Sequence, residues 1–194
     1  MHPPTPISRK CFHALWMIPL TLGIILSIGF HCFDWDHQIV DQIYSPTQGF
    51  FHEKDTWVTW IYHFTPLPGM LIAIPSLLAW IASIWLKPFQ RRRRIFAFLA
   101  LSMIIGPGIF VNAMFKDHYG RPRPRQTVEY SGDYAYHKVW VMGKHKDGRS
   151  FPSGHASVAF FMLCPTFLFI AYGKHRYAFL CLIIGLGWGC LVGW

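Results

Sequence analysis

The chain has 194 residues, of which 53% are hydrophobic, 18% aromatic and only 14% charged. This composition excludes an ordinary soluble domain, because soluble domains carry about 25% charged residues. The formal net charge of +9 does not indicate nucleic-acid binding, because the basic residues are divided among loops between apolar stretches and cannot form one continuous stripe along a duplex.

Five apolar stretches predict five transmembrane helices. They are Ala14–Phe33, Leu67–Leu86, Ile95–Phe115, His155–Tyr172 and Tyr177–Trp194. Each is close to the ~20 residues that a helix needs to cross the hydrocarbon. A soluble helical core would need polar faces at helical spacing, and these stretches show almost none. We therefore expect an all-α, polytopic membrane helical bundle in one domain, residues 1–194.

The first stretch follows Arg9 and Lys10, as a signal peptide would. It is longer than the usual apolar region of a signal peptide, and no small-residue cleavage pattern follows it. We therefore expect a retained transmembrane helix.

The basic residues predict the orientation of the chain. Short loops rich in Lys and Arg stay on the cytoplasmic side. Three alternate segments carry them: Arg9 and Lys10, then Lys87 with Arg91–Arg94, then Lys174 with Arg176. The acidic loop His31–Pro66 and the loop Lys116–Ser153 then face outward, in a bacterial-type cytoplasmic membrane. The second of these loops is basic itself, which suits an anion-binding site.

A first motif, Lys116 to Pro124 (KDHYGRPRP), ends the third apolar stretch. Its alternating prolines keep the segment extended, so the guanidinium groups should project away from the helix end. Arg123 can then bind two oxygens of a phosphate, while Lys116 supplies a point charge. Taken alone, the motif favours basic side chains that snorkel at the membrane boundary; together with the second motif described next, it favours phosphate binding.

A second motif, Phe151 to His155 (FPSGH), opens the fourth stretch. Ser153 can cap a helix and the amide of Gly154 can donate to an anion. His155 can transfer a proton, although a histidine bonded to a neighbouring helix is the alternative. The five cysteines show neither metal-ligand spacing nor a disulfide pattern.

Together, these motifs resemble those of the type 2 phosphatidic acid phosphatase superfamily, which also includes vanadium haloperoxidases. Its first motif is Lys, six residues, then Arg-Pro, as in Lys116 and Arg123-Pro124; its second is Pro-Ser-Gly-His, as in Pro152–His155. The resemblance implies six helices and a phosphate-binding role for Lys116, Arg123, Ser153 and Gly154. It also implies that His155 protonates the leaving oxygen and that no metal or other cofactor is required.

A third motif of that family has no match among the 194 residues. It is Ser-Arg, five residues, His, three residues, Asp, and its histidine attacks phosphorus. We expect the chain to be incomplete at its C-terminus, with five of six helices and without the nucleophilic histidine, so that the 194 residues alone are inactive. The alternative is a complete, shortened protein without catalysis.

The expected function is a membrane lipid phosphatase that acts at the outer membrane-water boundary through a phosphohistidine intermediate. The substrate would be a phosphomonoester or pyrophosphate of an isoprenoid, a glycerolipid or a lipid A type lipid. A lipid phosphotransferase would use the same residues, and a non-catalytic protein that binds anionic headgroups is the rival class. The expected partners are the lipid substrate and membrane lipids; the headgroup and the oligomeric state leave no trace in the sequence.

Overall fold

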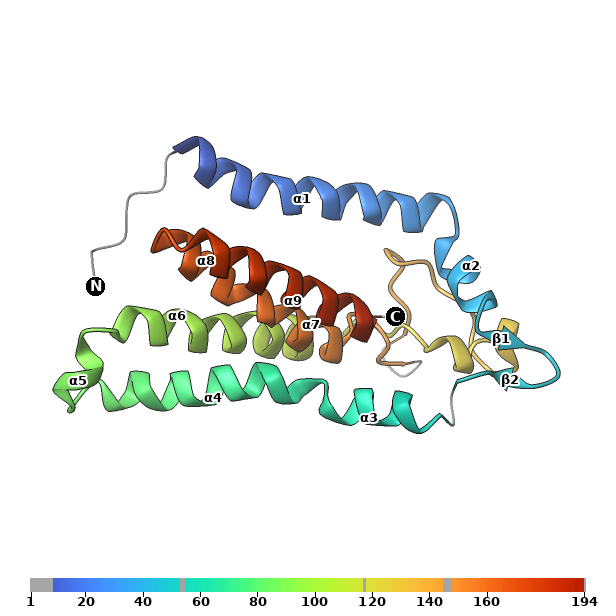
Figure 1. Ribbon diagram of the computed structural model, residues 1–194. Coiled ribbons are helices and arrows are strands. Elements are labelled where there is room, and N and C mark those ends of the chain that lie inside the picture. Colours follow the sequence, from blue (N-terminus) through green and yellow to red (C-terminus); the bar gives the residue numbers. More distant parts are fainter. Residues whose placement is uncertain (1–8, 53–54, 117, 145–147, 194) are drawn as a thin grey trace. The chain divides into compact units, whose positions relative to one another are not determined.

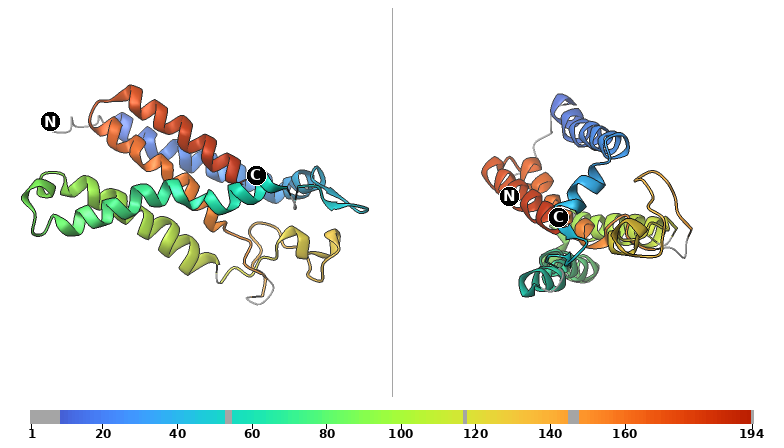
Figure 2. Two further views of the ribbon diagram at one scale, coloured as in Figure 1. Left: turned by 60° about the horizontal axis from the view of Figure 1, so that its bottom comes forward. Right: turned by 90° about the vertical axis from the view of Figure 1, so that its right-hand side faces the viewer.

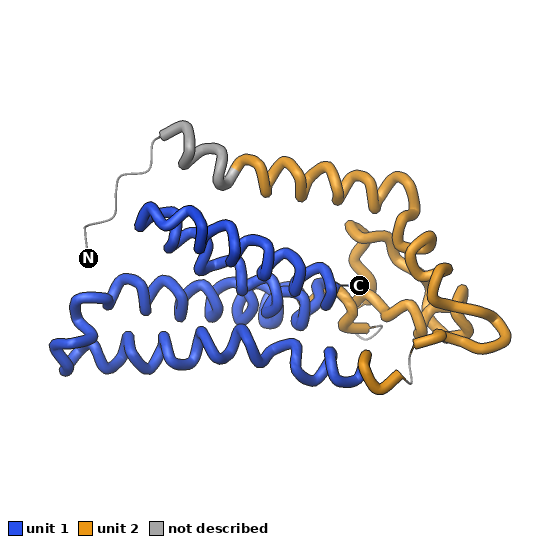
Figure 3. The backbone as a smooth tube through the Cα atoms, in the orientation of Figure 1, with its two compact units in different colours: residues 1–5, 59–115, 152–194 blue, residues 6–58, 116–151 orange. Residues whose placement is uncertain are grey.

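The computed structural model describes residues 9–52, 55–116, 118–144 and 148–193, with side chains from residue 17 onward. The described chain is mostly helical and has one short pair of strands (Figure 1). It forms two compact units (Figure 3). We call residues 59–115 and 152–193 the helical unit, and residues 9–58 and 116–151 the mixed unit.

The helical unit contains the end of α3 (Thr56–Phe64) and eight further helical segments. They are α4 (Pro66–Ala82), α5 (Lys87–Gln90), α6 (Arg93–Met103), the π-helix η1 (Ile104–Lys116), α7 (Gly154–Phe160), the 3-10 turn η4 (Phe161–Leu163), α8 (Cys164–Ala171) and α9 (His175–Gly193). The mixed unit contains α1 (Arg9–Cys32), α2 (Trp35–Asp41), the strands β1 (Tyr44–Ser45) and β2 (Gly49–Phe50), and the 3-10 turns η2 (Pro124–Gln126) and η3 (Val128–Tyr130).

Four helical stretches are long and apolar enough to cross a membrane. They are Thr56–Ala82, Arg93–Lys116, Gly154–Ala171 and His175–Gly193. A fifth candidate is the pair Met17–Cys32 and Trp35–Asp41, which bends by 74° at its break. The predicted all-α membrane bundle is confirmed, and the chain is an integral membrane protein.

The second predicted stretch, Leu67–Leu86, has different bounds in the structure. The helical run begins at Thr56 and ends at Ala82, so part of the predicted loop His31–Pro66 is helical. Pro66 does not stop the helix, because the first turn of α4 needs no backbone donor. Just before it, the Thr65 amide donates to the Ile61 carbonyl at 2.8 Å, which continues α3 into α4.

Prolines also shape the third and fourth stretches. The third changes from α6 to the π-helix η1, which contains Pro107. Pro107 has no N–H to donate, and its carbonyl accepts a bond of 2.6 Å from the Asn112 side-chain amide. In the fourth stretch, Pro165 lies in the first turn of α8, directly after η4. Both stretches remain helical despite prolines in their interiors, as membrane helices allow.

Small residues let the helices of this unit approach closely. α4 packs against α6, and α9 packs against α7, η4 and α8 (Figures 1 and 2). A Cβ atom on Gly189 of α9 would lie 2.3 Å from the Phe160 ring, and one on Gly185 would lie 2.7 Å from Leu163 Cδ2. Residues four apart share a helix face, so these glycines form the face of α9 that contacts α7 and η4. Such contacts drive helix association in lipid.

The mixed unit is organised around an aromatic cluster. β1 and β2 pair as an antiparallel hairpin. The Tyr44 ring lies 5.0 Å from Phe50 and 4.9 Å from Tyr130 of η3, centroid to centroid. Tyr119, Tyr130 and Val139 are among its buried side chains. The segment after Lys116 therefore folds onto the chain that follows α1.

Candidate functional site

Lys116 and Arg123, the predicted phosphate-binding cations, both belong to the mixed unit. Lys116 is the last residue of η1 and is half-buried. Arg123 has extended backbone angles, φ −73 and ψ 152, directly before Pro124. Its amide donates to Gln126 Oε1 at 2.9 Å, while its side chain is exposed. The extended backbone predicted around Arg123 is confirmed, and its guanidinium is accessible to a ligand.

Arg121 behaves differently, although it belongs to the same Arg-Pro repeat. Its Nη2 lies 2.6 Å from Asp36 Oδ2, and its Nε donates to the His137 carbonyl at 3.0 Å. The two charged side chains are only 13% and 19% exposed. The Arg121 guanidinium is therefore bonded inside the mixed unit, whereas the Arg123 side chain is exposed. A shielded guanidinium needs a paired carboxylate, and Asp36 of α2 supplies it.

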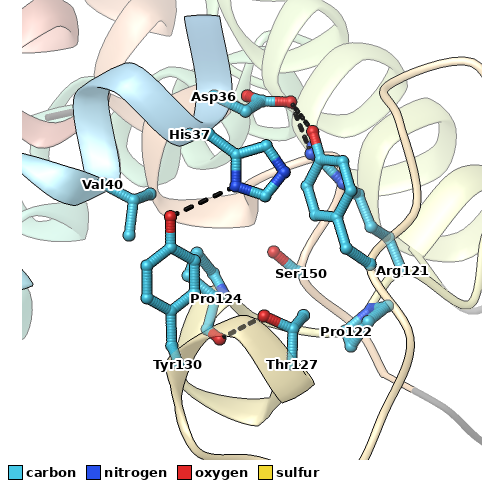
Figure 4. A pocket seen from close by; sticks show the side chains of 10 residues that line it. Asp36, His37, Val40, Arg121, Pro122, Pro124, Thr127, Tyr130 and Ser150 are labelled. Carbon is cyan, nitrogen blue, oxygen red and sulfur yellow. Dashed lines mark hydrogen bonds and ion pairs between the residues drawn. The ribbon is translucent and has the colours of Figure 1, made fainter. Parts of the chain in front are cut away.

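A second side chain completes the bonding of Asp36. The Tyr136 hydroxyl donates to Asp36 Oδ2 at 2.9 Å, and the Arg121 guanidinium lies 5.7 Å from the centroid of the Tyr136 ring. Burial, together with the hydrogen bond to Asp36, raises the pKa of Tyr136 to about 12. These groups border a cavity of about 80 Å³ (Figure 4). Asp36, Arg121 and Tyr136 at its border bond one another, so these side chains stabilise the fold of the mixed unit.

Further bonds join the two segments of the mixed unit. The Tyr130 hydroxyl donates to Asp41 Oδ1 at 2.9 Å and lies 3.2 Å from His37 Nδ1. Lys138 Nζ lies 2.8 Å from Asp34 Oδ1, and this bond holds the pKa of Asp34 below its usual value. Lys138, like Arg121, is therefore paired with an acidic side chain. Part of the basic character of the loop Lys116–Ser153 therefore serves internal pairing, at Arg121 and Lys138.

The second motif starts α7 in the helical unit. Ser153 is the N-cap: its Oγ accepts a bond from the Ala156 amide at 3.2 Å, as the sequence predicts. The Ser153 side chain remains exposed, and Gly154 is the first helical residue. A serine hydroxyl that accepts from the cap amide keeps its own O–H to donate to a ligand.

His155 stacks on Tyr62, a contact that sequence reasoning missed. The two rings are 4.3 Å apart between centroids, with 26° between their planes. His155 is half-buried and lies in the first turn of α7. Tyr62 belongs to α3, inside the segment predicted as a loop. The aromatic run from Trp57 to Phe64, which has no Gly or Pro before Pro66, is the signal that could have revealed this helix.

The five predicted site residues thus fall in both units. Lys116 and Arg123 lie in the mixed unit, whereas Ser153, Gly154 and His155 lie in the helical unit. Within its own unit, each motif presents groups suited to a phosphate: an accessible guanidinium in one, and a capped helix start with a stacked imidazole in the other.

The sequence model of the PAP2 superfamily matches residues 95–194. The lipid A 4'-phosphatase of Francisella tularensis subsp. novicida is 31% identical over 153 residues, which cover 78% of this chain and 64% of the relative. No solved structure matches.

Two further relatives match over a shorter range. The lipid A 4'-phosphatases of Rhizobium leguminosarum and Rhizobium etli are each 38% identical over 64 residues, or 32% of this chain. These 64 residues cover 28% and 25% of the two relatives. The chain therefore spans less than two thirds of the length of the curated relatives it matches.

Proposed function

The chain belongs to the PAP2 superfamily, and from this membership we propose that it provides most of the phosphate site of a membrane lipid phosphatase. The proposed substrate is a phosphomonoester of a lipid A type glycolipid. One observation carries the proposal. Both phosphate motifs, Lys116–Pro124 and Pro152–His155, are complete and lie within residues 95–194, the range that the family's sequence model matches. The substrate class follows the names of the relatives.

In the proposed site, the two motifs bind one phosphoryl group. Lys116 and Arg123 neutralise its oxygens, and Ser153 Oγ and the Gly154 amide donate hydrogen bonds to them. Such fixed donors stabilise the charge that spreads over the phosphoryl oxygens in the transition state.

His155 is the proposed general acid. An attacking imidazole nitrogen forms a bond to phosphorus as the P–O ester bond breaks, and protonated His155 gives its proton to the leaving sugar oxygen. Water then cleaves the phosphohistidine, His155 accepts a proton from that water, and inorganic phosphate is released. The stacked Tyr62 ring supports this role, because it restricts the orientation of the imidazole.

The attacking histidine is part of the proposal and not of the 194 residues. The family's third motif has no match among them, so we assign the attack to a histidine in a segment outside this chain.

We further propose that the site faces outward from a cytoplasmic membrane and that residues 1–194 act as one domain. The alternating basic segments support the orientation. A lipid substrate suits a site at the boundary, because its acyl chains hold the headgroup there at high effective concentration.

The test is phosphate release from lipid A. The protein encoded by the full coding sequence is purified and assayed with lipid A in mixed micelles, and mass spectrometry locates the lost phosphate. We expect release from the 4' position and rates at least ~100-fold lower in His155→Ala and Arg123→Ala, which is typical when a general acid or a phosphate ligand is removed.

The matched control is Arg125→Ala, two residues from Arg123 in the same Arg-Pro repeat. It should keep its activity within a few-fold. Phosphate release that persists in His155→Ala would contradict the assigned roles. Absence of release from lipid A, with release from another lipid phosphate, would refute the substrate class alone.

A further inference from the structure

Three consecutive apolar side chains are exposed at one turn of the mixed unit. Trp140 is 59% exposed, Val141 44% and Met142 67%. We call residues 139–143 the Trp140 turn. Single exposed apolar residues are common on proteins, but contiguous ones mark contact surfaces.

The turn is held in place by Tyr119 of the first motif. The Val141 amide donates to the Lys138 carbonyl at 2.9 Å, which closes the turn. The Tyr119 hydroxyl donates to the Val139 carbonyl, and the Tyr119 carbonyl accepts from the Gly143 amide at 3.0 Å. One buried tyrosine therefore holds both ends of the turn, so the three apolar side chains project from a fixed backbone.

Two glycines bring the backbones of the motif and the turn together. A Cβ atom on Gly143 would lie 2.3 Å from the Gly120 carbonyl oxygen, and one on Gly120 would lie 2.3 Å from the Lys144 carbonyl oxygen. Gly120 also has φ +64, which favours glycine. The Tyr119-Gly120 pair therefore fixes the turn next to the segment that carries Arg123.

The segment that carries the Trp140 turn is connected at both ends to helices able to cross a membrane. The segment 117–153 connects two stretches able to cross a membrane, Arg93–Lys116 and Gly154–Ala171, so both of its ends lie at a membrane boundary. Tryptophan is enriched at that boundary, where its ring is apolar and its N–H polar.

From the fixed, exposed apolar turn and its tether to two spans, we propose that Trp140, Val141 and Met142 insert into the headgroup region of the membrane. This contact is independent of the phosphatase proposal and would hold for a non-catalytic protein. Its consequence for a lipid phosphatase is that the segment carrying Arg123 is held at the depth of lipid phosphates.

The test places a nitroxide label on the turn in liposomes. In a background without the five native cysteines, Met142→Cys is labelled, and its collisions with lipid-soluble oxygen and with a water-soluble nickel chelate are measured by electron paramagnetic resonance. Glu129→Cys, an exposed polar position of the same unit, is the matched reference. We expect the ratio of oxygen to nickel collisions to be several-fold higher at Met142 than at Glu129.

Two results would overturn the proposal. If nickel reaches the label at Met142 as readily as the label at Glu129, the turn lies in water. If neither reagent reaches it, protein covers the turn instead of lipid. Trp140→Cys repeats the measurement two residues away in the same turn, so that failure of one variant to fold leaves the other to decide.

Discussion

Different interactions stabilise the inside of the helical unit and the inside of the mixed unit. In the helical unit, glycines permit close packing, and buried hydroxyls such as those of Ser76 and Ser83 donate to carbonyls of their own helices. In the mixed unit, side chains far apart in sequence bond each other, as in Asp36 with Arg121 and Asp41 with Tyr130. In lipid, helices gain no hydrophobic driving force for association, so close packing has to stabilise their contacts. A polar segment without regular helical hydrogen bonds needs hydrogen bonds between side chains to fix its conformation.

The largest effect should come from removing a small residue in the helical unit. Gly189→Val places a side chain where a Cβ would already lie 2.3 Å from the Phe160 ring, and we expect a loss of about 3 kcal/mol in the free energy of unfolding. Thermal unfolding in detergent, followed by circular dichroism, measures it.

Gly187→Val is the matched control, because no atom lies within 4 Å of a Cβ at that position of the same helix. Equal destabilisation by the two valines would mean that helix propensity, and not packing, is responsible.

A smaller effect is expected in the mixed unit from Arg121→Ala. The change removes the charged partner of the shielded Asp36 carboxylate and leaves the Tyr136 hydroxyl bonded to it, at a cost of about 2 kcal/mol. The same melting experiment measures this loss, and Arg121→Lys should recover part of it. A melting temperature equal to that of the wild type would show that the Asp36–Arg121 pair contributes nothing to stability.

The smallest effect is a pH dependence that arises from Tyr136. Its pKa is raised from 10.0 to about 12 in the folded protein, so folding favours the neutral phenol. Its contribution to stability is complete below pH 10 and is lost as the pH rises from about 10 to about 12. Melting curves across this range should show a steeper fall for the wild type than for Tyr136→Phe. The same pH dependence in the wild type and in Tyr136→Phe would contradict the claim that the raised pKa of Tyr136 contributes to stability.

The spans could be predicted from the sequence because length and hydropathy are local properties. The stretches ending at Lys116 and beginning near His155 were predicted to within two residues. The start of the second stretch differs, because Pro66 after a polar segment predicts a loop, whereas in the structure it is the first residue of α4. The residues next to a proline in the sequence do not show whether it begins a helix or lies in a loop, because proline is common in both places.

The site could be predicted only in part. Ser153 as a cap and Arg123 as an exposed cation follow from local chemistry, and the structure has both. Arg121 could not be separated from Arg123, because both stand before prolines and the difference arises from Asp36, 85 residues away. Tyr62 could not be linked to His155 for the same reason.

Thermal unfolding with and without inorganic phosphate most directly tests the central claim that Arg123 binds phosphate while Arg121 stabilises the fold. A ligand that binds the folded state raises the melting temperature, so we expect the wild type to gain stability on adding phosphate. Arg121→Ala should melt at a lower temperature but still respond to phosphate. Arg123→Ala should melt as the wild type does and lose the response; a full wild-type response in Arg123→Ala would contradict the account.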